Sequence, residues 1–473
     1  MIFDPKRAIH RALFYSILSI FTLVTCLYLG ALLFKKDTPS YCAHVDFCMR
    51  YNSARDFLSG TTPYAQQRKQ LNLKQKSGQL PYNDPSVQSD WHSPSTLRAL
   101  SLPMQVFFFF PFLPYYTAKS IHLFTSVILL FLLPILLARR YGFLKTMHWH
   151  SPRLQDMIAA SLFFLYLNAA PVAFALSYGQ PTIIVACCLL AAFFLTKKTW
   201  CQSLLLLIAT IAKYNLMPLF LICLLFKKQF RILIYVGIGL LLSNLIPLLA
   251  HGISPIQAAS EYLALIRDSL FTSQSVEKSM GLFSLLNVDY LFQSTHLAWL
   301  IKAVLLTSLL LVYRHEWRMK RASISVTTFC LLSLITMLIV YQRLFNAIML
   351  LPLFSVFTYQ FFLKKKTLPF LFSFLGLTLL ALPLNVMFVW SSFLSSAIFS
   401  VVDLGAVFSY GVYTPETLVL YSRLRDLAYQ IMLTIMSPFS QFYSIPIYGV
   451  LCLIIFFIVL VQFLKQEFLS WKQ

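Results

Sequence analysis

The sequence predicts an all-α protein that crosses a membrane many times. Of its 473 residues, 59% are hydrophobic and only 11% are charged, whereas globular chains carry about 25% charged residues because a soluble surface needs them. Apolar runs near the length of about 20 residues that a helix needs to cross a bilayer recur along the chain. The net charge of +22 falls mainly in short clusters at the ends of these runs, which is typical of membrane topology and argues against nucleic acid as the partner.

Ten apolar runs are expected to be membrane-spanning helices. In chain order they are residues 13–34, 121–138, 157–176, 183–196, 232–250, 299–313, 324–341, 347–363, 368–390 and 447–464. Two more apolar segments, 100–116 and 204–226, have lengths that do not suit one crossing. The chain 1–473 is therefore expected to form a single integral membrane domain, a bundle of about ten to twelve transmembrane helices.

Seven clusters of Lys and Arg set the expected orientation, because short loops rich in these residues stay in the cytoplasm. They hold more than half of the 38 basic residues: Lys6/Arg7/Arg11, Arg139/Arg140/Lys145/Arg153, Lys197/Lys198, Lys227/Lys228/Arg231, Arg314/Arg318/Lys320/Arg321, Lys364–Lys366 and Lys465/Lys472. Both termini are then cytoplasmic. The first span is expected to stay as an anchor, because it is too long for a signal-peptide core and lacks a small-residue cleavage site.

The cytoplasmic assignment makes two segments unusual. Residues 199–226 lie between two basic clusters but are too few for two full crossings, which need about 40 residues. A hairpin of two half-length helices fits, with Lys213-Tyr214-Asn215 at its apex and Pro218 just beyond. Such irregular backbone at membrane depth is tolerated only inside protein or along a wet cavity. Segment 100–116 is expected to be a short, proline-broken helix, interfacial or re-entrant.

Three long polar stretches fall on the opposite, extracytoplasmic face: residues 35–98, 251–298 and 391–446. Function is expected there, since the cytoplasmic loops are short and carry little besides charge. In 35–98, the apolar positions after Asp46 recur at helical spacing: Phe47, Tyr51, Ala54 and Leu58. Gly60 suits a helix C-cap and Pro63 prevents continuation. This pattern predicts a short amphipathic helix on the membrane surface, with Asp46 at its N-terminal end.

Residues of this first loop resemble the D-x4-Y-x2-A-x3-L-x-G-x2-P-Y signature of glycosyltransferase family 87, through Asp46, Tyr51, Ala54, Leu58, Gly60, Pro63 and Tyr64. Gly179-Gln180, opening an apolar run, resembles the Gly-Gln motif of the family. Ala212-Lys213 with Pro218 and a trailing basic cluster is similar to its Lys-to-Pro segment. The resemblance covers about the first 250 residues. The chain departs from the Tyr-Pro-Pro and Trp-x-His elements common in the family, which leaves sugar and acceptor open.

The resemblance implies a membrane glycosyltransferase of the GT-C type that takes a sugar from a polyprenyl-phosphate donor, with mannose as the family's best-known case. The acceptor would be a lipid-linked or cell-envelope glycan, and the transfer inverting. Asp46 is the expected general base, and Lys213 and Arg343 are expected to bind the donor phosphate. Gln180, Tyr64 and Arg55 are further candidates for substrate binding.

Each of these residues has an ordinary alternative role. Asp46 could cap its helix, and Lys213 could extend towards lipid headgroups. Arg343 could contact a headgroup, Gln180 could hydrogen-bond a helix start, and Tyr64 could anchor the first loop at the interface.

No cofactor is expected, and no metal-binding residues are identified, because no paired His and carboxylate ligands stand at metal-binding spacing and no P-loop occurs. A metal requirement stays open. Seven of the nine Cys lie in apolar runs and are expected to behave as small hydrophobic residues. The other two, Cys42 and Cys48, could form a disulfide in an oxidising compartment.

The expected location is a bacterial inner membrane with the site facing the periplasm, and the expected partners are membrane lipid, donor and acceptor. Absence of any Asn-x-Ser/Thr acceptor agrees with a bacterial location. Two other classes stay open. A transporter or flippase of lipid-linked saccharides predicts internal repeats and loop carboxylates without a catalytic role. A membrane scaffold predicts tolerance to substitution of Asp46 and Lys213.

Overall fold

The computed structural model describes residues 45–58, 109–140, 179–261, 288–292, 295–319, 324–339, 344–351 and 447–471, together with isolated positions between and before these ranges. This part of the chain is helical and contains no strand. Its elements are α2 (Val45–Leu58), α6 (Tyr115–Arg140), α9 (Thr182–Leu190), η3 (Ala191–Leu195), α10 (Thr199–Lys213), η4 (Tyr214–Leu216), α11 (Pro218–Phe226), α12 (Phe230–Ala250), α14 (Val288–Leu291), α15 (Thr295–Arg318), α16 (Val326–Ile339), η7 (Leu344–Leu350) and α21 (Ile447–Trp471).

The expected all-α membrane bundle is confirmed. Three described helices are long and apolar enough to cross a membrane, Tyr115–Arg140, Phe230–Ala250 and His296–Arg318, and three shorter ones are strongly apolar. They coincide with six predicted spans. Helix α6 begins before the expected residue 121, because the turn at 110–113 ends in Pro114, whose carbonyl accepts a hydrogen bond from Ala118 N. The spans 13–34 and 368–390 and the loop 391–446 lie outside the described ranges.

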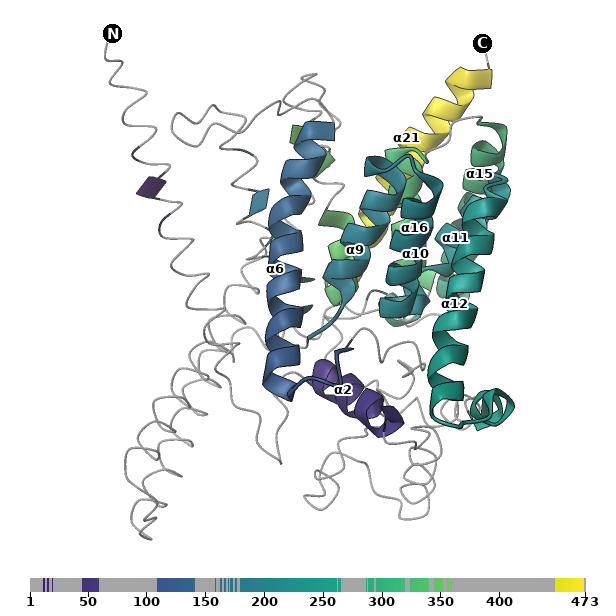
Figure 1. Ribbon diagram of the computed structural model, residues 1–473. Helices are drawn as coiled ribbons and strands as arrows, with labels where there is room; N and C mark the ends of the chain where they lie inside the picture. The colour runs from purple at the N-terminus through teal and green to yellow at the C-terminus, as the bar shows by residue number, and fades with distance from the viewer. Residues whose placement is uncertain are drawn as a thin grey trace.

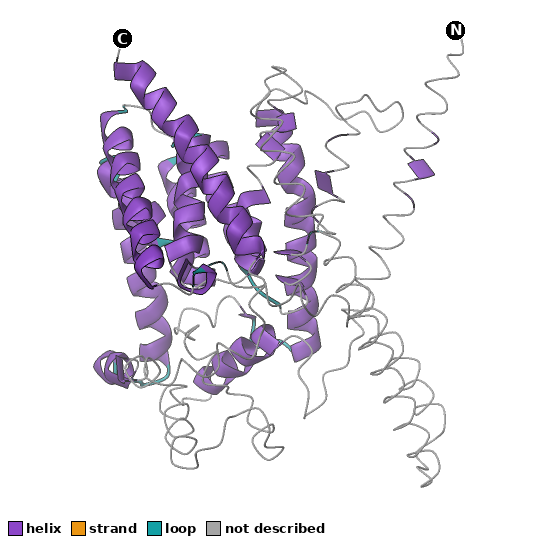
Figure 2. Ribbon diagram, turned by 180° about the vertical axis from the view of Figure 1, so that it is seen from behind, coloured by secondary structure: helices purple, strands orange, loops and turns teal. Residues whose placement is uncertain are grey.

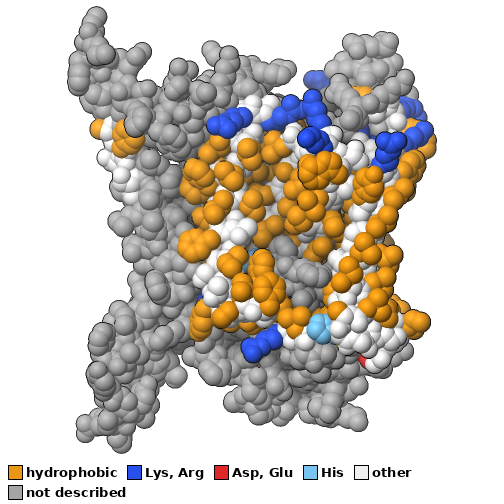
Figure 3. Space-filling model, viewed as in Figure 1, with side chains coloured by type: hydrophobic (Ala, Val, Ile, Leu, Met, Phe, Trp, Pro, Cys, Tyr) orange, Lys and Arg blue, Asp and Glu red, His pale blue; other side chains and the backbone are white. Residues whose placement is uncertain are grey.

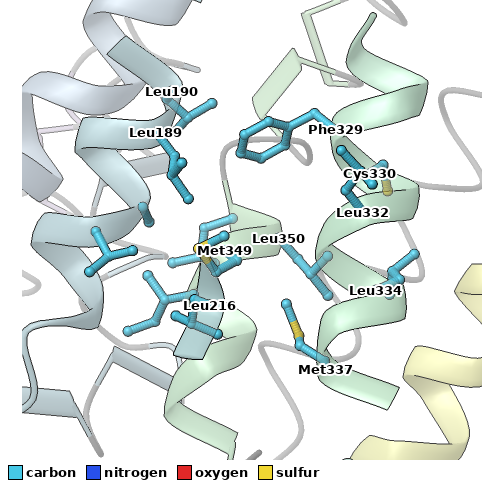
Figure 4. Packing of buried hydrophobic residues seen from close by; sticks show 14 of the residues in the cluster. Leu189, Leu190, Leu216, Phe329, Cys330, Leu332, Leu334, Met337, Met349 and Leu350 are labelled. Carbon is cyan, nitrogen blue, oxygen red and sulfur yellow. The ribbon is translucent and has the colours of Figure 1, made fainter. Parts of the chain in front are cut away.

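Helices α9 and α16 form the interior of the bundle (Figure 1). All nine residues of α9 are buried, as is α16 from Thr328 to Leu338. Leu189 and Leu190 of α9 face Phe329 and Leu332 of α16 across the core (Figure 4). Helix α21 lies against α16 on the far side of the bundle (Figure 2). Burying these apolar side chains against one another is the expected packing for helices that have no polar face.

Helices α6, α12 and α15 form the outside of the bundle. They expose large apolar side chains such as Ile128, Leu241 and Leu310, and Figure 3 shows this apolar surface between the two polar ends. Because a soluble protein rarely exposes an apolar surface of this extent, the belt is the face that contacts lipid.

The predicted hairpin of two half-length helices is confirmed within 199–226. Helix α10 ends at Lys213, the 3₁₀ turn η4 follows, and α11 begins at Pro218. Proline favours the first position of a helix, where no N–H is needed, so Pro218 suits the start of α11. The backbone leaves the helical region at Lys213, where φ is −160° and ψ is 81°. The sequence thus breaks the hairpin at the residue that carries its buried charge.

The two ends of the bundle differ. At one end, here called the basic end, the helix connections carry Lys and Arg, for example Arg140, Lys198, Lys227 and Arg318. Figure 3 shows Lys and Arg side chains gathered at this end. The other end, here called the α2 end, is covered by α2, which lies across it in Figures 1 and 2. Helix α2 is the predicted amphipathic helix, with Phe47, Tyr51, Ala54 and Phe57 buried.

Candidate functional site

The centre of the candidate site is the ammonium group of Lys213, at the α2 end. Its side chain is only 6% exposed. The Nζ atom donates hydrogen bonds to Gln180 Oε1 at 3.0 Å, Thr182 Oγ1 at 3.1 Å and Asn346 Oδ1 at 2.7 Å. Three acceptors match the three donors of an ammonium group. All three are uncharged, so these contacts stabilise the positive charge without neutralising it.

These contacts also fix the direction of two side-chain amides. An ammonium group only donates, so the oxygen and not the NH₂ of Gln180 and of Asn346 must face Lys213. Thr182 Oγ1 donates to the same Asn346 oxygen at 3.4 Å. The NH₂ group of each amide therefore points away from Lys213. Residues from three parts of the chain, up to 133 positions apart from Lys213, are held as one unit.

Gln180 reaches this position through a tight helix ending. Gly179 N donates to Leu176 O at 3.2 Å and Gln180 N donates to Ala175 O at 2.7 Å. This pair of bonds is the Schellman ending, which requires left-handed backbone at its glycine. Gly179 has φ +67°, as the motif demands. The chain then enters α9 directly, which places Gln180 and Thr182 on the same side of Lys213.

Helix α2 is docked on the same residues. A Cβ atom added to Gly179 would lie 2.4 Å from Phe47 Cβ, so α2 touches the backbone of the Gly-Gln turn. Farther along α2, Arg50 Nη1 donates to Ala212 O at 3.4 Å, immediately before Lys213. The Phe57 ring then contacts the His251 ring at the end of α12. The helix therefore crosses the α2 end from the Gly-Gln turn to α12.

Aromatic side chains secure α2 against the start of α6. Phe47 and Tyr51 pack with Phe109 and Tyr115, and Tyr51 OH donates to Leu113 O at 2.7 Å. Such ring pairs contribute about 0.5–1.5 kcal/mol each beyond their buried area. Helix α2 is thus fixed in position against α6.

Two more buried polar side chains on α6 face this aromatic group. Lys119 is 2% exposed and its Nζ lies 6.0 Å and 5.8 Å from the ring centroids of Tyr115 and Tyr116. The His122 ring lies 5.3 Å from that of Phe47. Together with Arg50 and Lys213, Lys119 makes three buried cations on three helices at the α2 end. This arrangement favours an anionic ligand.

The structure brings two of the expected site residues, Gln180 and Lys213, into direct contact. Asp46 lies in the first turn of α2, beside Phe47, although the description does not extend to its side chain. Arg55 is on the exposed face of α2. Arg343, Tyr64 and the possible disulfide partner Cys42 lie outside the described residues, as does the side chain of Cys48.

Sequence reasoning did not single out Arg50, Thr182 or Asn346 as site residues. The position of Arg50, four residues after Asp46, gave a signal, because residues i and i+4 share one helix face. In the described part of the chain, no group of three His, Cys, Asp or Glu side chains could hold a metal ion.

Comparison with known proteins identifies a family. The sequence matches glycosyltransferase family 87 over residues 103–341, which is half of the chain and includes Gln180 and Lys213. No curated protein and no solved structure matches the sequence significantly.

Proposed function

The chain belongs to glycosyltransferase family 87 and is a membrane glycosyltransferase; from that premise we propose that it transfers a sugar from a polyprenyl-phosphate donor to a hydroxyl of a lipid-linked or cell-envelope glycan, with Asp46 as general base. The observation that carries the proposal is the contact between Phe47 and Gly179. It joins the residue after Asp46 to the residue before Gln180, and Gln180 binds Lys213. The proposed base and the buried cation thus share one end of the bundle.

The proposed reaction inverts the anomeric carbon. The acceptor hydroxyl oxygen attacks that carbon, and its proton passes to the Asp46 carboxylate. The bond from the anomeric carbon to the phosphate oxygen breaks, and the lipid phosphate leaves with the electron pair. The positive charge of Lys213, together with Arg343, stabilises the negative charge that develops on the phosphate. A charge buried this deeply acts more strongly than one in water.

Several features of the α2 end suit a lipid-carried donor. The donor phosphate is held at the membrane surface by its lipid tail, and α2 crosses the end of a bundle with an apolar outer surface. Arg55, on the exposed face of α2, is proposed to contact the phosphate-bearing substrate, and Tyr64 is proposed as a further substrate contact. Mannose is the proposed donor sugar because it is the best-known donor sugar of the family.

The test is transfer by the purified full-length protein from polyprenyl-phosphate mannose. Asp46→Asn is expected to reduce transfer by about 10²- to 10⁴-fold, the usual contribution of a general base, while the protein stays folded. Asp56→Asn, on the same helix, is the matched control and is expected to retain transfer. If Asp46→Asn has wild-type turnover, Asp46 is not the base.

We further propose that the protein lies in a bacterial inner membrane with the α2 end in the periplasm. The exposed Lys and Arg at the basic end support this, because such residues favour the cytoplasmic side. In a variant whose native Cys are replaced by Ser, Arg55→Cys, exposed on α2, is expected to react with a membrane-impermeant maleimide added to intact spheroplasts. Reaction only after the membrane is opened would reverse the orientation.

A further inference from the structure

Asn215 presents a buried oxygen that has no hydrogen-bond partner. It lies in η4, two residues after Lys213, and its Oδ1 atom is one of two such buried side-chain atoms in the described residues. The turn that carries it is firmly placed. Met217 N donates to Tyr214 O at 3.0 Å, and Leu216 and Met217 are both buried. The backbone that carries Asn215 is therefore held in position by the fold.

A buried acceptor without a partner is costly. It forfeits its bond to water, at a cost of about 1–3 kcal/mol, and more than 90% of buried polar groups in folded proteins are paired. A ligand that binds at this turn would remove the cost. The oxygen can only accept, so its partner must carry a donor such as a hydroxyl group, and a phosphate oxygen does not meet that need.

The second unpaired atom, Ser333 Oγ, has a simpler explanation. Ser333 lies inside α16, where a hydroxyl can rotate to donate to the carbonyl four residues earlier. Thr336 does so on the same helix, donating to Leu332 O at 2.7 Å. Asn215 lies in a 3₁₀ turn between two helices and its unpaired atom is a carbonyl oxygen, which cannot donate. Asn215 is thus the position where a bound ligand would supply a missing hydrogen-bond partner.

The location of Asn215 indicates which ligand this is. The turn follows Lys213, and the Arg50 guanidinium of α2 donates to Ala212 O just before it. Helix α2 also carries Asp46, the proposed base. A hydroxyl bound at Asn215 is therefore close to the cations proposed for the phosphate and to the helix that activates the acceptor. Sugars are the substrates of a glycosyltransferase that are rich in hydroxyl groups.

We propose that Asn215 Oδ1 accepts a hydrogen bond from a hydroxyl of the transferred or the accepting sugar, and is a sugar-recognition residue of this enzyme. The proposal rests on the proposed function, because it presupposes a lipid-carried sugar at the α2 end. Asn215 then binds the saccharide, and the buried cations bind the phosphate.

The experiment compares the stabilisation that two lipids give to the full-length protein in detergent. One is a short polyprenyl phosphate, and the other is the same lipid carrying mannose, glucose or galactose. The difference between their thermal shifts measures recognition of the sugar alone. The variants are Asn215→Leu, which has a similar volume and no acceptor, Asn215→Asp, which keeps an acceptor oxygen, and Ser333→Ala as control.

The proposal expects Asn215→Leu to be at least as stable as the wild type without ligand, since the unpaired atom is gone. The affinity that the sugar adds to lipid binding should fall about tenfold in this variant, which is the value of one such hydrogen bond. The thermal shift given by the polyprenyl phosphate without sugar should persist. Asn215→Asp and Ser333→Ala should keep the sugar-specific shift. If Asn215→Leu instead raises about tenfold the KM for a soluble methyl glycoside acceptor, the bound hydroxyl belongs to the acceptor.

Two results overturn the proposal. One is an Asn215→Leu protein that matches the wild type in both the sugar-specific thermal shift and the KM for the methyl glycoside acceptor. The other is an Asn215→Leu protein that is less stable than the wild type without ligand, which would make Asn215 a structural residue. If the wild-type protein itself recognises no sugar-bearing lipid, the proposed function fails and this inference fails with it. If the wild-type protein recognises the sugar-bearing lipid and Asn215→Leu recognises it equally well, only the role of Asn215 is refuted.

Discussion

Two buried lysines at opposite ends of the bundle are stabilised in different ways. At the basic end, Lys227 Nζ lies 2.7 Å from Glu316 Oε2, and both side chains are 2% exposed. The other Glu316 oxygen accepts a hydrogen bond from Thr328 Oγ1 at 2.6 Å. At the α2 end, Lys213 Nζ is bound by three neutral oxygens. One charge is paired with a carboxylate, and the other is bound only by neutral groups in these contacts.

We interpret the charge of Lys227 as structural and the charge of Lys213 as functional. The Lys227–Glu316 pair joins the end of α11 to α15, and through Thr328 to α16. Its net charge is zero, so it offers little to a charged ligand. Lys213 lies where the backbone is irregular, which at membrane depth is tolerated inside protein or along a wet cavity. A buried charge is costly, and charged residues inside membranes usually serve function.

The largest expected effect is on stability, at the basic end. Lys227→Met leaves the Glu316 carboxylate buried without its counter-charge, and breaking a buried pair in this way costs about 3–5 kcal/mol. The melting temperature in detergent should fall sharply. Transfer by the protein that remains folded should be unchanged, because the pair lies at the end opposite α2.

The control for Lys227→Met is the double variant Lys227→Met/Glu316→Gln, which removes both charges. It should recover much of the lost stability, since no isolated charge is left. If it is no more stable than the single variant, the ion pair is not what holds α11 to α15.

The second effect is on the reaction, at the α2 end. Lys213→Met keeps most of the side-chain length but removes the charge that orients Gln180 and Asn346. Transfer from polyprenyl-phosphate mannose should fall by about 10²- to 10³-fold, the usual loss when one electrostatic contact to the transition state is removed. The measurement is kcat and KM of the purified protein.

Lys302→Met supplies the matched control for Lys213. Lys302 lies on α15 with its Nζ 5.1 Å from the centroid of the Trp299 ring, and its loss should leave transfer unchanged. A Lys213→Met protein with normal kcat and the instability of Lys227→Met would remove the distinction between the two ends.

Much of this arrangement could be predicted from the sequence, because local patterns determine it. The 3.6-residue spacing of Phe47, Tyr51 and Ala54 predicted α2. The basic clusters around 199–226 predicted the half-length hairpin and its apex at Lys213. Gly179-Gln180 was singled out through its resemblance to the Gly-Gln motif, and the left-handed helix ending at Gly179 was found only in the structure.

The contacts within the site could not be predicted in the same way. Asn346 binds Lys213 from a position 133 residues later, and Arg50 binds Ala212 across 162 residues. No local pattern encodes such pairs, since they arise only when the helices pack together. The unpaired state of Asn215 Oδ1 is of the same kind, because it depends on which groups the fold leaves out of reach.

The smallest expected effect tests whether α2 must stay docked for Lys213 to function. Gly179→Ala would place a Cβ 2.4 Å from Phe47 Cβ and would force left-handed backbone on alanine, at a cost of about 1–2 kcal/mol. Gly252→Ala imposes similar strain at φ +66° but meets nothing within 4 Å. Both variants should lose stability in a thermal melt, and Gly179→Ala should lose more because of its clash with Phe47. Gly179→Ala alone should also lose about tenfold in transfer by the folded protein, because reacting groups displaced by about 1 Å lose rate steeply. Equal transfer by the two variants would mean that the α2 contact contributes only to folding, and that the base acting with Lys213 lies elsewhere.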